Sequence, residues 1–233
     1  MGVQTKAVAS SADPYFSNVV LLALNESGAD GTTTFLDRSN AARALTPVGN
    51  AQWDSDVAPP GGLSSWLLLD GTGDAVYAAD STDFEFGSGD FTLEIWATQS
   101  SATSYRGLIT KSKTSGSDSE YEWYINAGNK MEFYYYSPTL QSYIVSYTPA
   151  AGDHLAICRD GANLRFFQNG TQVGTTHNIG TSTIRTGTGQ LIIGAFGSGY
   201  TLAFAGNLGA ARITNIARYT ANFIPPTLPL PTS

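Results

Sequence analysis

The sequence predicts an all-β protein, a sandwich of two antiparallel sheets. The chain has 233 residues with 25 glycines, 12% aromatic residues and only 13% charged residues. This composition favours many short strands and tight turns over surface helices. Segment after segment alternates apolar and other residues with a period of two, which a strand satisfies and a helix does not. The length is common for a single sandwich domain.

The first third of the chain alternates strands with turns. We expect the first strand at 15–24, which is apolar on both faces, as in a strand buried inside a sandwich. The segment D-G-T-G-D at 70–74 has the composition of a hairpin turn and is expected to join the strands on either side of it. Further strands in this third are expected at 32–35, 48–53, 66–69 and 75–77.

Residues 81–96, which read S-T-D-F-E-F-G-S-G-D-F-T-L-E-I-W, form the unit around which the chain is organised. The G-S-G segment at 87–89 allows the positive backbone angles of a tight turn. The alternation at 91–96 then predicts a strand inside a sheet. We expect Phe84 and Phe86 to fold back over that strand.

An aromatic hairpin is predicted at 121–136, with a turn at 127–129. If Asn126 faces Lys130, the two strands present one polar and one apolar face. The apolar face, expected in the core, carries Tyr121, Trp123, Ile125, Met131, Phe133 and Tyr135. The opposite face carries Glu122, Tyr124, Glu132, Tyr134 and Tyr136.

The rest of the sequence predicts one domain with an extension at each end. We divide the chain into an N-terminal arm at 1–12, a sandwich domain at 13–224 and a proline-rich tail at 225–233 that lies extended on the surface. The other expected elements are strands at 108–111, 143–147, 154–158, 164–168, 191–193 and 208–213, and one helical turn at 213–219.

Five segments, in the order expected for the family, resemble the laminin-G-like, concanavalin A-like lectin/glucanase domains of tailed-bacteriophage virion proteins and bacterial surface proteins. The most specific is D-F-E-F-G-S-G-D-F-T-L-E-I-W at 83–96. The resemblance extends from Asp13 to Pro229 and implies a concanavalin A-like jelly roll. The other four segments are D-P-Y-F-S-N-V-V-L-L from Asp13, L-L-L-D-G-T-G-D-A-V from Leu67, H-L-A-I-C-R-D-G from His154 with L-R-F-F-Q-N-G from Leu164, and A-R-Y-T-A-N-F-I-P-P from Ala217.

Charge and cysteine content exclude several classes of function. The 19 acidic and 12 basic side chains give a net charge of −7, which repels phosphate backbones, so we expect no nucleic-acid partner. The single Cys158 cannot form an internal disulfide, and its apolar strand predicts a core position. The first residues lack an apolar core of signal-peptide length and no later window approaches a membrane span, so we expect no signal peptide and no membrane insertion.

The acid pattern of a glycan-cleaving enzyme is missing. Glucanase relatives carry E-x-D-x-x-E on one strand face, whereas Glu120 and Glu122 share a face without the rest, and Glu132 stands on the neighbouring strand. His154 and His177 have no carboxylate at a metal-ligand spacing, and we expect His154 to hydrogen-bond within the fold. We therefore predict no catalytic residues and a non-enzymatic protein.

Four aspartates are candidate ligands for calcium, which laminin-G-like relatives often bind. Asp70, Asp74, Asp80 and Asp83 offer hard oxygen ligands, although aspartates beside glycines also serve ordinary turns. Where the family often reads G-x-[IL]-D-E-[VL]-R-I, this chain has G-N-L-G-A-A-R-I from Gly206, without the acidic pair. We expect no required cofactor, with calcium as the alternative.

The polar face of the aromatic hairpin has the chemistry of a sugar site. Tyrosine rings can cover the apolar side of a sugar, and glutamates can accept hydrogen bonds from its hydroxyls. Tyrosine-rich faces also pack against other subunits, so a host-surface glycan and a second copy of the chain are both candidate partners. The candidate ligand-binding residues are Glu122, Tyr124, Glu132, Tyr134 and Tyr136.

The resemblance implies a structural and adhesive protein on the surface of a tailed-phage virion, made in the host cytoplasm. We expect a capsid decoration protein. A tail-fibre or host-receptor adhesin that binds glycans is the alternative, and a glycan-cleaving enzyme with a rearranged acid pair is the third hypothesis. The expected partners are other virion proteins and further copies of the chain, contacted through the arm before Asp13 and the tail after Phe223.

Overall fold

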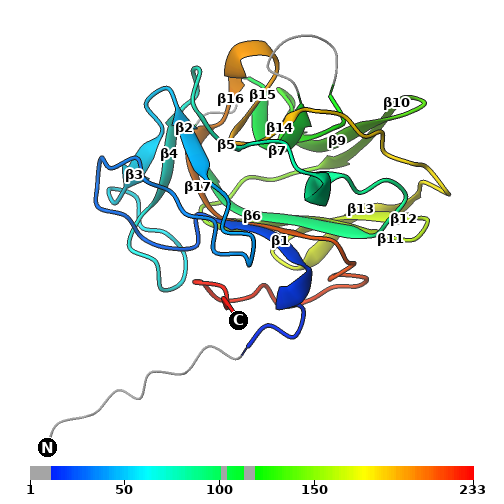
Figure 1. Ribbon diagram of the computed structural model, residues 1–233, viewed down its shortest axis with the longest axis horizontal. Coiled ribbons are helices and arrows are strands. Elements are labelled where there is room, and N and C mark those ends of the chain that lie inside the picture. Colours follow the sequence, from blue (N-terminus) through cyan, green and yellow to red (C-terminus); the bar gives the residue numbers. More distant parts are fainter. Residues whose placement is uncertain (1–11, 101–103, 113–118) are drawn as a thin grey trace, which may run out of the picture.

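The protein is a sandwich of two antiparallel sheets, as the sequence predicts (Figure 1). The computed structural model describes residues 12–100, 104–112 and 119–233, so residues 1–11 of the predicted arm lie outside the described residues. Within this part of the chain, no helix has the length and apolar character needed to span a bilayer. Its helical elements are three short 3-10 turns at Phe16–Asn18, Thr82–Phe84 and Ser198–Tyr200.

The first sheet, which we call the back sheet, is centred on the strand predicted at 91–96. That strand, β6, pairs with β11 on one side and with β17 on the other. β1 (Val19–Ala23) also pairs with β17. The other strands, in spatial order, are β13 (Thr171–Asn178), β12 (Asn163–Gln168), β11 (Asp153–Asp160), β6 (Phe91–Gln99), β17 (Ala205–Thr214), β4 (Trp66–Asp70) and β3 (Gln52–Asp54).

The second sheet, the front sheet, contains the aromatic hairpin. Two very short strands, β15 (Ala195–Phe196) and β16 (Leu202–Ala203), form a separate hairpin at the top of Figure 1, beside β7. The strands of the front sheet, in spatial order, are β10 (Thr139–Ser146), β9 (Lys130–Ser137), β8 (Tyr121–Ile125), β7 (Arg106–Ser112), β14 (Gln190–Ile193), β5 (Ala75–Ala78) and β2 (Leu45–Val48).

The core lies between the two sheets and is filled by the inward residues of each strand. Phe91, Leu93 and Ile95 of β6 are fully buried, and Phe86 stacks on Phe91 with ring centroids 4.4 Å apart, as the turn at 87–89 predicts. Each such side chain contributes about 1.5–3 kcal/mol on burial. The predicted apolar face of the aromatic hairpin is also fully buried: Tyr121, Trp123, Ile125, Met131, Phe133 and Tyr135.

The prediction of a hairpin around residues 70–74 is wrong. β4 pairs with β3 and β17 in the back sheet, whereas β5 pairs with β2 and β14 in the front sheet. Gly71 and Gly73 both have positive φ, and the chain uses this freedom to cross from one sheet to the other. Turn composition specifies a sharp reversal but not the sheet in which the next strand finds its partner.

Two other predicted strands in this region differ from the structure. The strand predicted at 48–53 is divided by a turn at Gly49, whose φ is +67°, so that β2 and β3 belong to different sheets. Residues 32–35 form no strand. Phe35 is nevertheless buried, with the centroid of its ring 5.1 Å from that of Trp53. Its side chain therefore packs in the core although the residue belongs to no strand.

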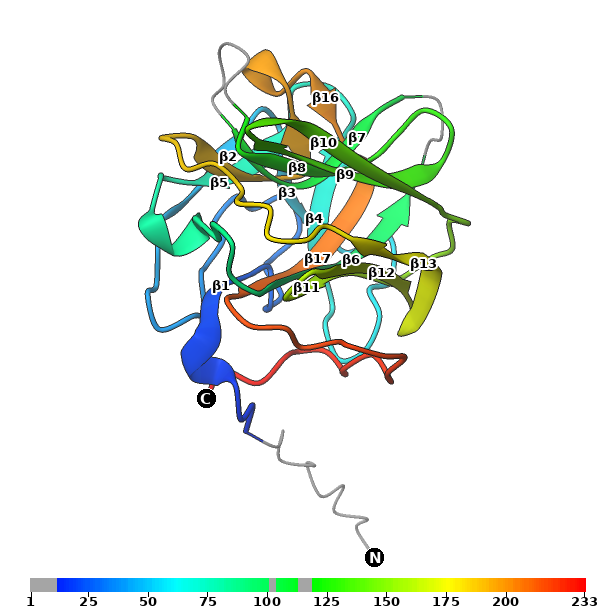
Figure 2. The same cartoon turned by 90° about the vertical axis from the view of Figure 1, so that its right-hand side faces the viewer.

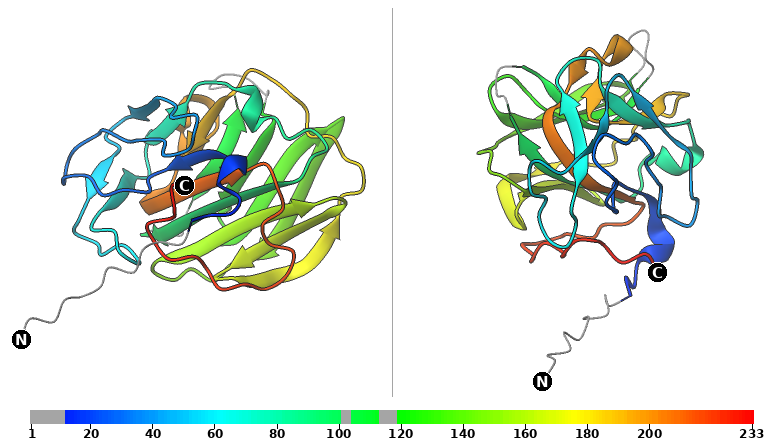
Figure 3. Two further views of the ribbon diagram at one scale, coloured as in Figure 1. Left: turned by 60° about the horizontal axis from the view of Figure 1, so that its bottom comes forward. Right: turned by 90° about the vertical axis from the view of Figure 1, so that its left-hand side faces the viewer.

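Residues 215–233, the C-terminal segment, run across the outer face of the back sheet (Figures 2 and 3). No helical turn forms at 213–219, because β17 continues to Thr214 and the chain then bends. The proline-rich tail lies extended over this face, and two of its leucines pack against the domain. Leu228 and Leu230 are 7% and 2% exposed, and the Asn25 side chain hydrogen-bonds both backbone polar groups of Leu230 at 2.9 and 2.7 Å.

Candidate functional site: a pocket on the outer face of the front sheet

The β15–β16 hairpin covers part of the outer face of the front sheet. Gly107 on β7 makes this close approach possible, because a Cβ atom there would lie 2.3 Å from the carbonyl carbon of Ala195. The Thr110 hydroxyl donates a hydrogen bond to the Ala195 carbonyl oxygen at 3.0 Å. The hairpin is thereby fixed over β7 and forms a wall beside the outer face of β9 and β10.

A pocket of about 320 Å³, the outer pocket, lies where this wall meets the open strands. Its lining combines aromatic and aliphatic side chains with hydroxyl groups and one carboxylate. β8, β9 and β10 supply the floor, and the hairpin supplies the wall. The lining includes Ser119, Glu122, Tyr134, Tyr136, Leu140, Phe196 and Leu202.

Glu122 is the carboxylate of the outer pocket. The residue is only 2% exposed, and its Oε1 accepts a hydrogen bond from Ser119 Oγ at 2.5 Å. Among the residues that the structure describes, no donor reaches its Oε2. Burial raises the pKa of Glu122, and the neighbouring hydroxyls of Ser119 and Tyr134 offset this only in part. Glu122 is therefore an almost completely buried carboxylate in the lining of the outer pocket.

The predicted register of the aromatic hairpin is confirmed. β8 and β9 pair so that Glu122 lies opposite Tyr134 and Tyr124 lies opposite Glu132. All five predicted ligand residues therefore belong to one face of the front sheet. Three of them line the outer pocket: Glu122, Tyr134 and Tyr136.

The other two predicted ligand residues do not line the outer pocket. Tyr124 is only 5% exposed, because the ring of Phe196 stacks on it. Glu132 accepts hydrogen bonds from Asn126 Nδ2 at 3.1 Å and Ser142 Oγ at 2.8 Å. The prediction missed the β15–β16 hairpin, whose strands of two residues are too short to show a pattern.

Two of the aspartates predicted as calcium ligands shape a turn. Asp74 is 1% exposed, and its two carboxylate oxygens accept hydrogen bonds from the backbone N–H groups of Asn50 and Asp70, both at 2.9 Å. Asp70 Oδ1 accepts a hydrogen bond from the Thr72 N–H at 2.7 Å. These are the bonds by which aspartate stabilises turns beside glycine.

The other two aspartates pair with cations. Asp80 Oδ1 accepts a hydrogen bond from the fully buried Lys111 Nζ at 2.8 Å, and Asp83 forms an ion pair with Arg43. Within the described part of the chain, no group of three or more carboxylate, histidine or cysteine side chains is arranged to hold a metal ion. The four aspartates do not form one ligand set, and calcium stays the untested alternative to the expectation of no required cofactor.

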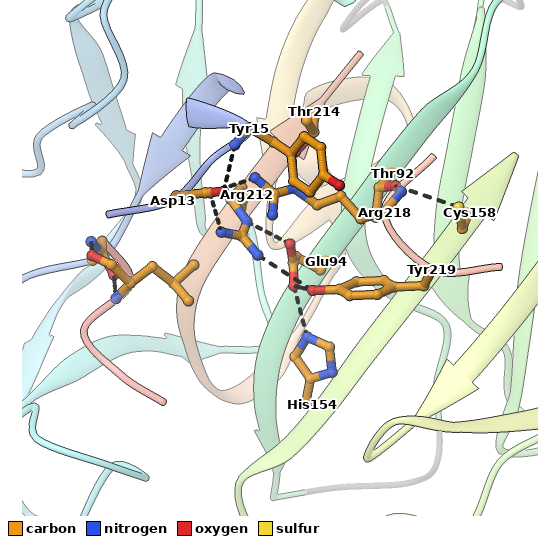
Figure 4. Close-up of polar contacts among 12 residues, drawn as sticks. Asp13, Tyr15, Thr92, Glu94, His154, Cys158, Arg212, Thr214, Arg218 and Tyr219 are labelled. Atoms are coloured by element: carbon orange, nitrogen blue, oxygen red, sulfur yellow. Dashed lines mark hydrogen bonds and ion pairs between the residues drawn. The ribbon is translucent and has the colours of Figure 1, made fainter. Parts of the chain in front are cut away.

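A buried charge network lies on the outer face of the back sheet, beneath the C-terminal segment (Figure 4). Arg212 Nε donates to Glu94 Oε1 at 2.5 Å, and His154 Nε2 lies 2.9 Å from Glu94 Oε2. The Tyr219 hydroxyl donates to the same Oε2 at 2.8 Å. Burial raises the pKa of Glu94, but the charge of Arg212 and the hydrogen bond of His154 outweigh it and hold this pKa well below its usual range.

Asp13 connects the network to the start of the described chain. Its Oδ2 accepts hydrogen bonds from Arg212 at 3.0 Å and from Arg218. Glu94 is completely buried and Arg212 is 3% exposed, so the network ties chain segments together and is closed to a ligand. The expectation that His154 hydrogen-bonds within the fold is confirmed.

Residues 70–222 match the sequence model of a family described as the concanavalin A-like lectin/glucanases superfamily. No curated protein is significantly similar to the chain in sequence.

Several solved structures share the fold. The binding domain of Paraclostridial mosquitocidal protein 1 superposes with a TM-score of 0.62 at 14% identity, over 87% of this chain and 50% of that chain. The binding domain of botulinum neurotoxin DC, solved with rat synaptotagmin II, gives 0.58 at 15% identity, over 87% and 49%. The botulinum neurotoxin serotype D binding domain gives 0.58 at 12% identity, over 88% and 50%. The chain spans about half the length of these structures, and identities this low establish a common fold.

Proposed function

Because the chain belongs to the concanavalin A-like lectin/glucanase superfamily, we propose that it is a non-catalytic carbohydrate-binding domain whose ligand occupies the outer pocket. The observation that carries the proposal is the outer pocket, which combines the side chains of Tyr134 and Tyr136 with polar groups that include Ser119 and Glu122. Sugars present hydroxyl donors together with apolar C–H faces, and this lining complements both. The three solved structures described above are themselves binding domains.

The arrangement of the two glutamates supports binding without catalysis. Each glutamate faces a different tyrosine across the strand pair, Glu122 facing Tyr134 and Glu132 facing Tyr124. The rings of those two tyrosines contact each other, with centroids 5.9 Å apart, and only Glu122 lines the outer pocket. A glycan-cleaving enzyme needs two carboxylates on either side of one scissile bond. Turnover of a polysaccharide that Glu122→Gln abolished would establish the enzyme alternative instead.

Binding to a glycan array tests the proposal, and β10 supplies a matched pair of variants. Leu140 and Ile144 lie on the same side of β10 with 53% and 46% exposure, but only Leu140 lines the outer pocket. We expect Leu140→Ala and Tyr134→Ala to weaken glycan binding at least fivefold and Ile144→Ala to leave it unchanged. Equal losses from Leu140→Ala and Ile144→Ala, or no binding to any glycan by the wild-type protein, would overturn the proposal.

We further propose that the domain serves on the surface of a tailed-phage virion, as a capsid decoration protein or, alternatively, as a tail-fibre adhesin. The resemblance of residues 83–96 to virion proteins of tailed phages supports this placement. Such a protein contacts other virion proteins and further copies of itself. Imaging the assembled particle tests the proposal, because density for the domain on the shell indicates decoration and density on the tail indicates an adhesin.

A further inference from the structure

We infer that the free edge of β10 is an interface at which a second copy of the chain binds. The β10 strands of the two copies pair antiparallel about a two-fold axis at Ser142, so that the two front sheets join into one. This pairing goes beyond the proposed function, because it concerns a strand edge and not the ligand of the outer pocket. Three features of β10 support it: an unprotected edge, backbone groups turned outward, and exposed side chains placed symmetrically about Ser142.

Three of the four edges at the ends of the two sheets are protected against pairing with another chain. In β3, Trp53 exchanges two backbone hydrogen bonds with residues 31–32, at 2.9 and 2.8 Å. β2 has only four residues and contains Pro47, which has no N–H to donate. In β13, the Gln172 N–H donates to Asn222 Oδ1 of the C-terminal segment at 2.8 Å. Covered, short or proline-bearing edges are the usual means by which proteins avoid adding a further strand.

β10 forms the fourth edge, at the outside of the front sheet, and has none of these protections (Figure 1). It pairs with β9 over eight residues, Thr139–Ser146, without a shift in register. The strand contains no proline, no glycine and no charged residue. Among the described residues, no segment other than β9 forms backbone hydrogen bonds with it. A long, uncharged edge of this kind is a template for one more strand.

The hydrogen bonds of β9 show which backbone groups of β10 point to the free edge. The Tyr136 N–H of β9 donates to the carbonyl oxygen of Glu120, on the β8 side, at 3.2 Å. A residue of an antiparallel ladder turns its N–H and C=O to the same neighbour, and successive residues alternate. Tyr135 therefore bonds to β10, where it faces Gln141. The residues of β10 that alternate with Gln141 turn both backbone groups to the free edge: Leu140, Ser142 and Ile144.

These three residues are arranged symmetrically about Ser142. Antiparallel pairing centred there places Ser142 opposite its counterpart and Leu140 opposite Ile144 of the second copy. At each of the three positions the two chains can then exchange N–H···O bonds. Leu140 and Ile144 are 53% and 46% exposed, and each gains an apolar neighbour across the axis. Such an interface is the same on both copies and closes at a dimer.

The expected dimer is weak. One strand edge with two half-exposed apolar side chains from each copy is a small interface, at the low end for specific complexes. The net charge of −7 on each copy opposes association at long range, and salt screens this repulsion. We therefore expect a dimer that forms at micromolar and higher concentrations and becomes tighter as the salt concentration rises.

Sedimentation of the wild-type protein over about 1–300 µM tests the pairing, because a dimer follows mass action. We expect the average mass to rise from that of a monomer toward twice that value. Ser142→Lys places two like charges opposite each other on the axis, which should keep the protein monomeric. Within one chain that lysine can pair with Glu132, which the Ser142 hydroxyl contacts at 2.8 Å. Thr175→Lys, an exposed position of β13, adds the same charge to another edge strand and should leave association unchanged.

Cysteine cross-linking tests the register and stays informative if Ser142→Lys fails to fold. Ser142→Cys brings two thiols to opposite positions with Cα atoms about 5.5 Å apart, a distance that a disulfide spans. Mild oxidation should therefore give a covalent dimer. Thr139→Cys lies on the same strand but about 20 Å from its counterpart in this register, so it should give none. The native Cys158 is fully buried and is the same in both variants.

Each contrary outcome overturns the β10 interface without affecting the glycan-binding proposal, which the array measures separately. A wild-type protein that stays monomeric at the highest concentration would exclude the dimer. A dimer that Ser142→Lys leaves intact, or that both lysine variants weaken equally, would have to form through another surface. Equal cross-linking of Ser142→Cys and Thr139→Cys would contradict the register.

Discussion

The ring of Phe196 stacks on the ring of Tyr124, with centroids 4.5 Å apart and planes inclined by 17°. Phe196 belongs to the β15–β16 hairpin and Tyr124 to β8, so this contact joins the wall of the outer pocket to its floor. Both residues are nearly buried, at 7% and 5% exposure. A tyrosine that strand alternation places on an open face thus becomes a support for the hairpin.

We predict that Phe196→Ala releases the hairpin from β8. The lost aromatic contact and the cavity left behind should lower the free energy of unfolding by about 3 kcal/mol. Glycan binding should weaken at least tenfold because the outer pocket loses its wall. Denaturant titration and a glycan-binding assay measure both effects. Tyr105→Ala is the control, because Tyr105 touches both rings but is 43% exposed and does not line the outer pocket. A Phe196→Ala protein that binds as wild type would contradict the role of the hairpin.

The aromatic hairpin could be predicted in detail because everything that determines it is local. Its two strands are joined by a short turn, and alternation with one register fixes which side chains share a face. The β15–β16 hairpin could not be predicted in the same way. Its position over β7 depends on Gly107, nearly ninety residues earlier. A single glycine in a strand does not indicate which distant segment will pack against it.

We predict that Glu122→Gln removes a pH dependence of stability. Burial raises the pKa of Glu122 in the folded protein above its unfolded value. The folded wild-type protein therefore binds a proton more tightly than the unfolded chain, and its free energy of unfolding falls as pH rises from about the unfolded pKa through the folded one. Glu122→Gln should be at least as stable as wild type at pH 7 and show a smaller gain on acidification to pH 4. Parallel pH profiles for the two proteins would contradict this.

We predict that Arg212→Ala is strongly destabilising. It leaves the completely buried carboxylate of Glu94 without its main counter-charge, which costs about 3–5 kcal/mol. The double variant Glu94→Gln/Arg212→Met removes both charges and should lose less stability than the single variant. Denaturant unfolding of the wild type, Glu94→Gln, Arg212→Met and this double variant completes a double-mutant cycle. Additive losses in the cycle would show that Glu94 and Arg212 are not energetically coupled and would contradict the prediction.

The network around Glu94 also shows a limit of structure prediction from the sequence pattern. An acidic residue within F-T-L-E-I-W falls on the outer side of a strand, which ordinarily indicates solvent exposure. Its partners Arg212 and Tyr219 lie more than a hundred residues away, and only the C-terminal segment folding over them makes the site buried. The pattern gives the correct side of the sheet but cannot show that this side is covered.

We predict that calcium does not stabilise the folded protein. Asp80 is paired with Lys111 and Asp83 with Arg43, and each carboxylate oxygen of Asp74 accepts a backbone hydrogen bond, so a divalent ion would have to compete with existing partners. Thermal unfolding with excess Ca²⁺ and with a chelator should give melting temperatures within about 1 °C of each other. Because a ligand that binds only the folded state raises the melting temperature, a rise of several degrees with Ca²⁺ would contradict this prediction.

The C-terminal segment supplies a matched pair of residues for testing whether it is part of the folded domain. Leu230 is 2% exposed and held by Asn25, whereas Ile224, in the same segment, is 92% exposed. Leu230→Ala should lower the free energy of unfolding by about 2–3 kcal/mol through lost burial and a residual cavity. Ile224→Ala should change it by less than about 0.5 kcal/mol. Denaturant titration distinguishes the two, and equal, negligible effects would mean that the tail does not dock on the back sheet in solution.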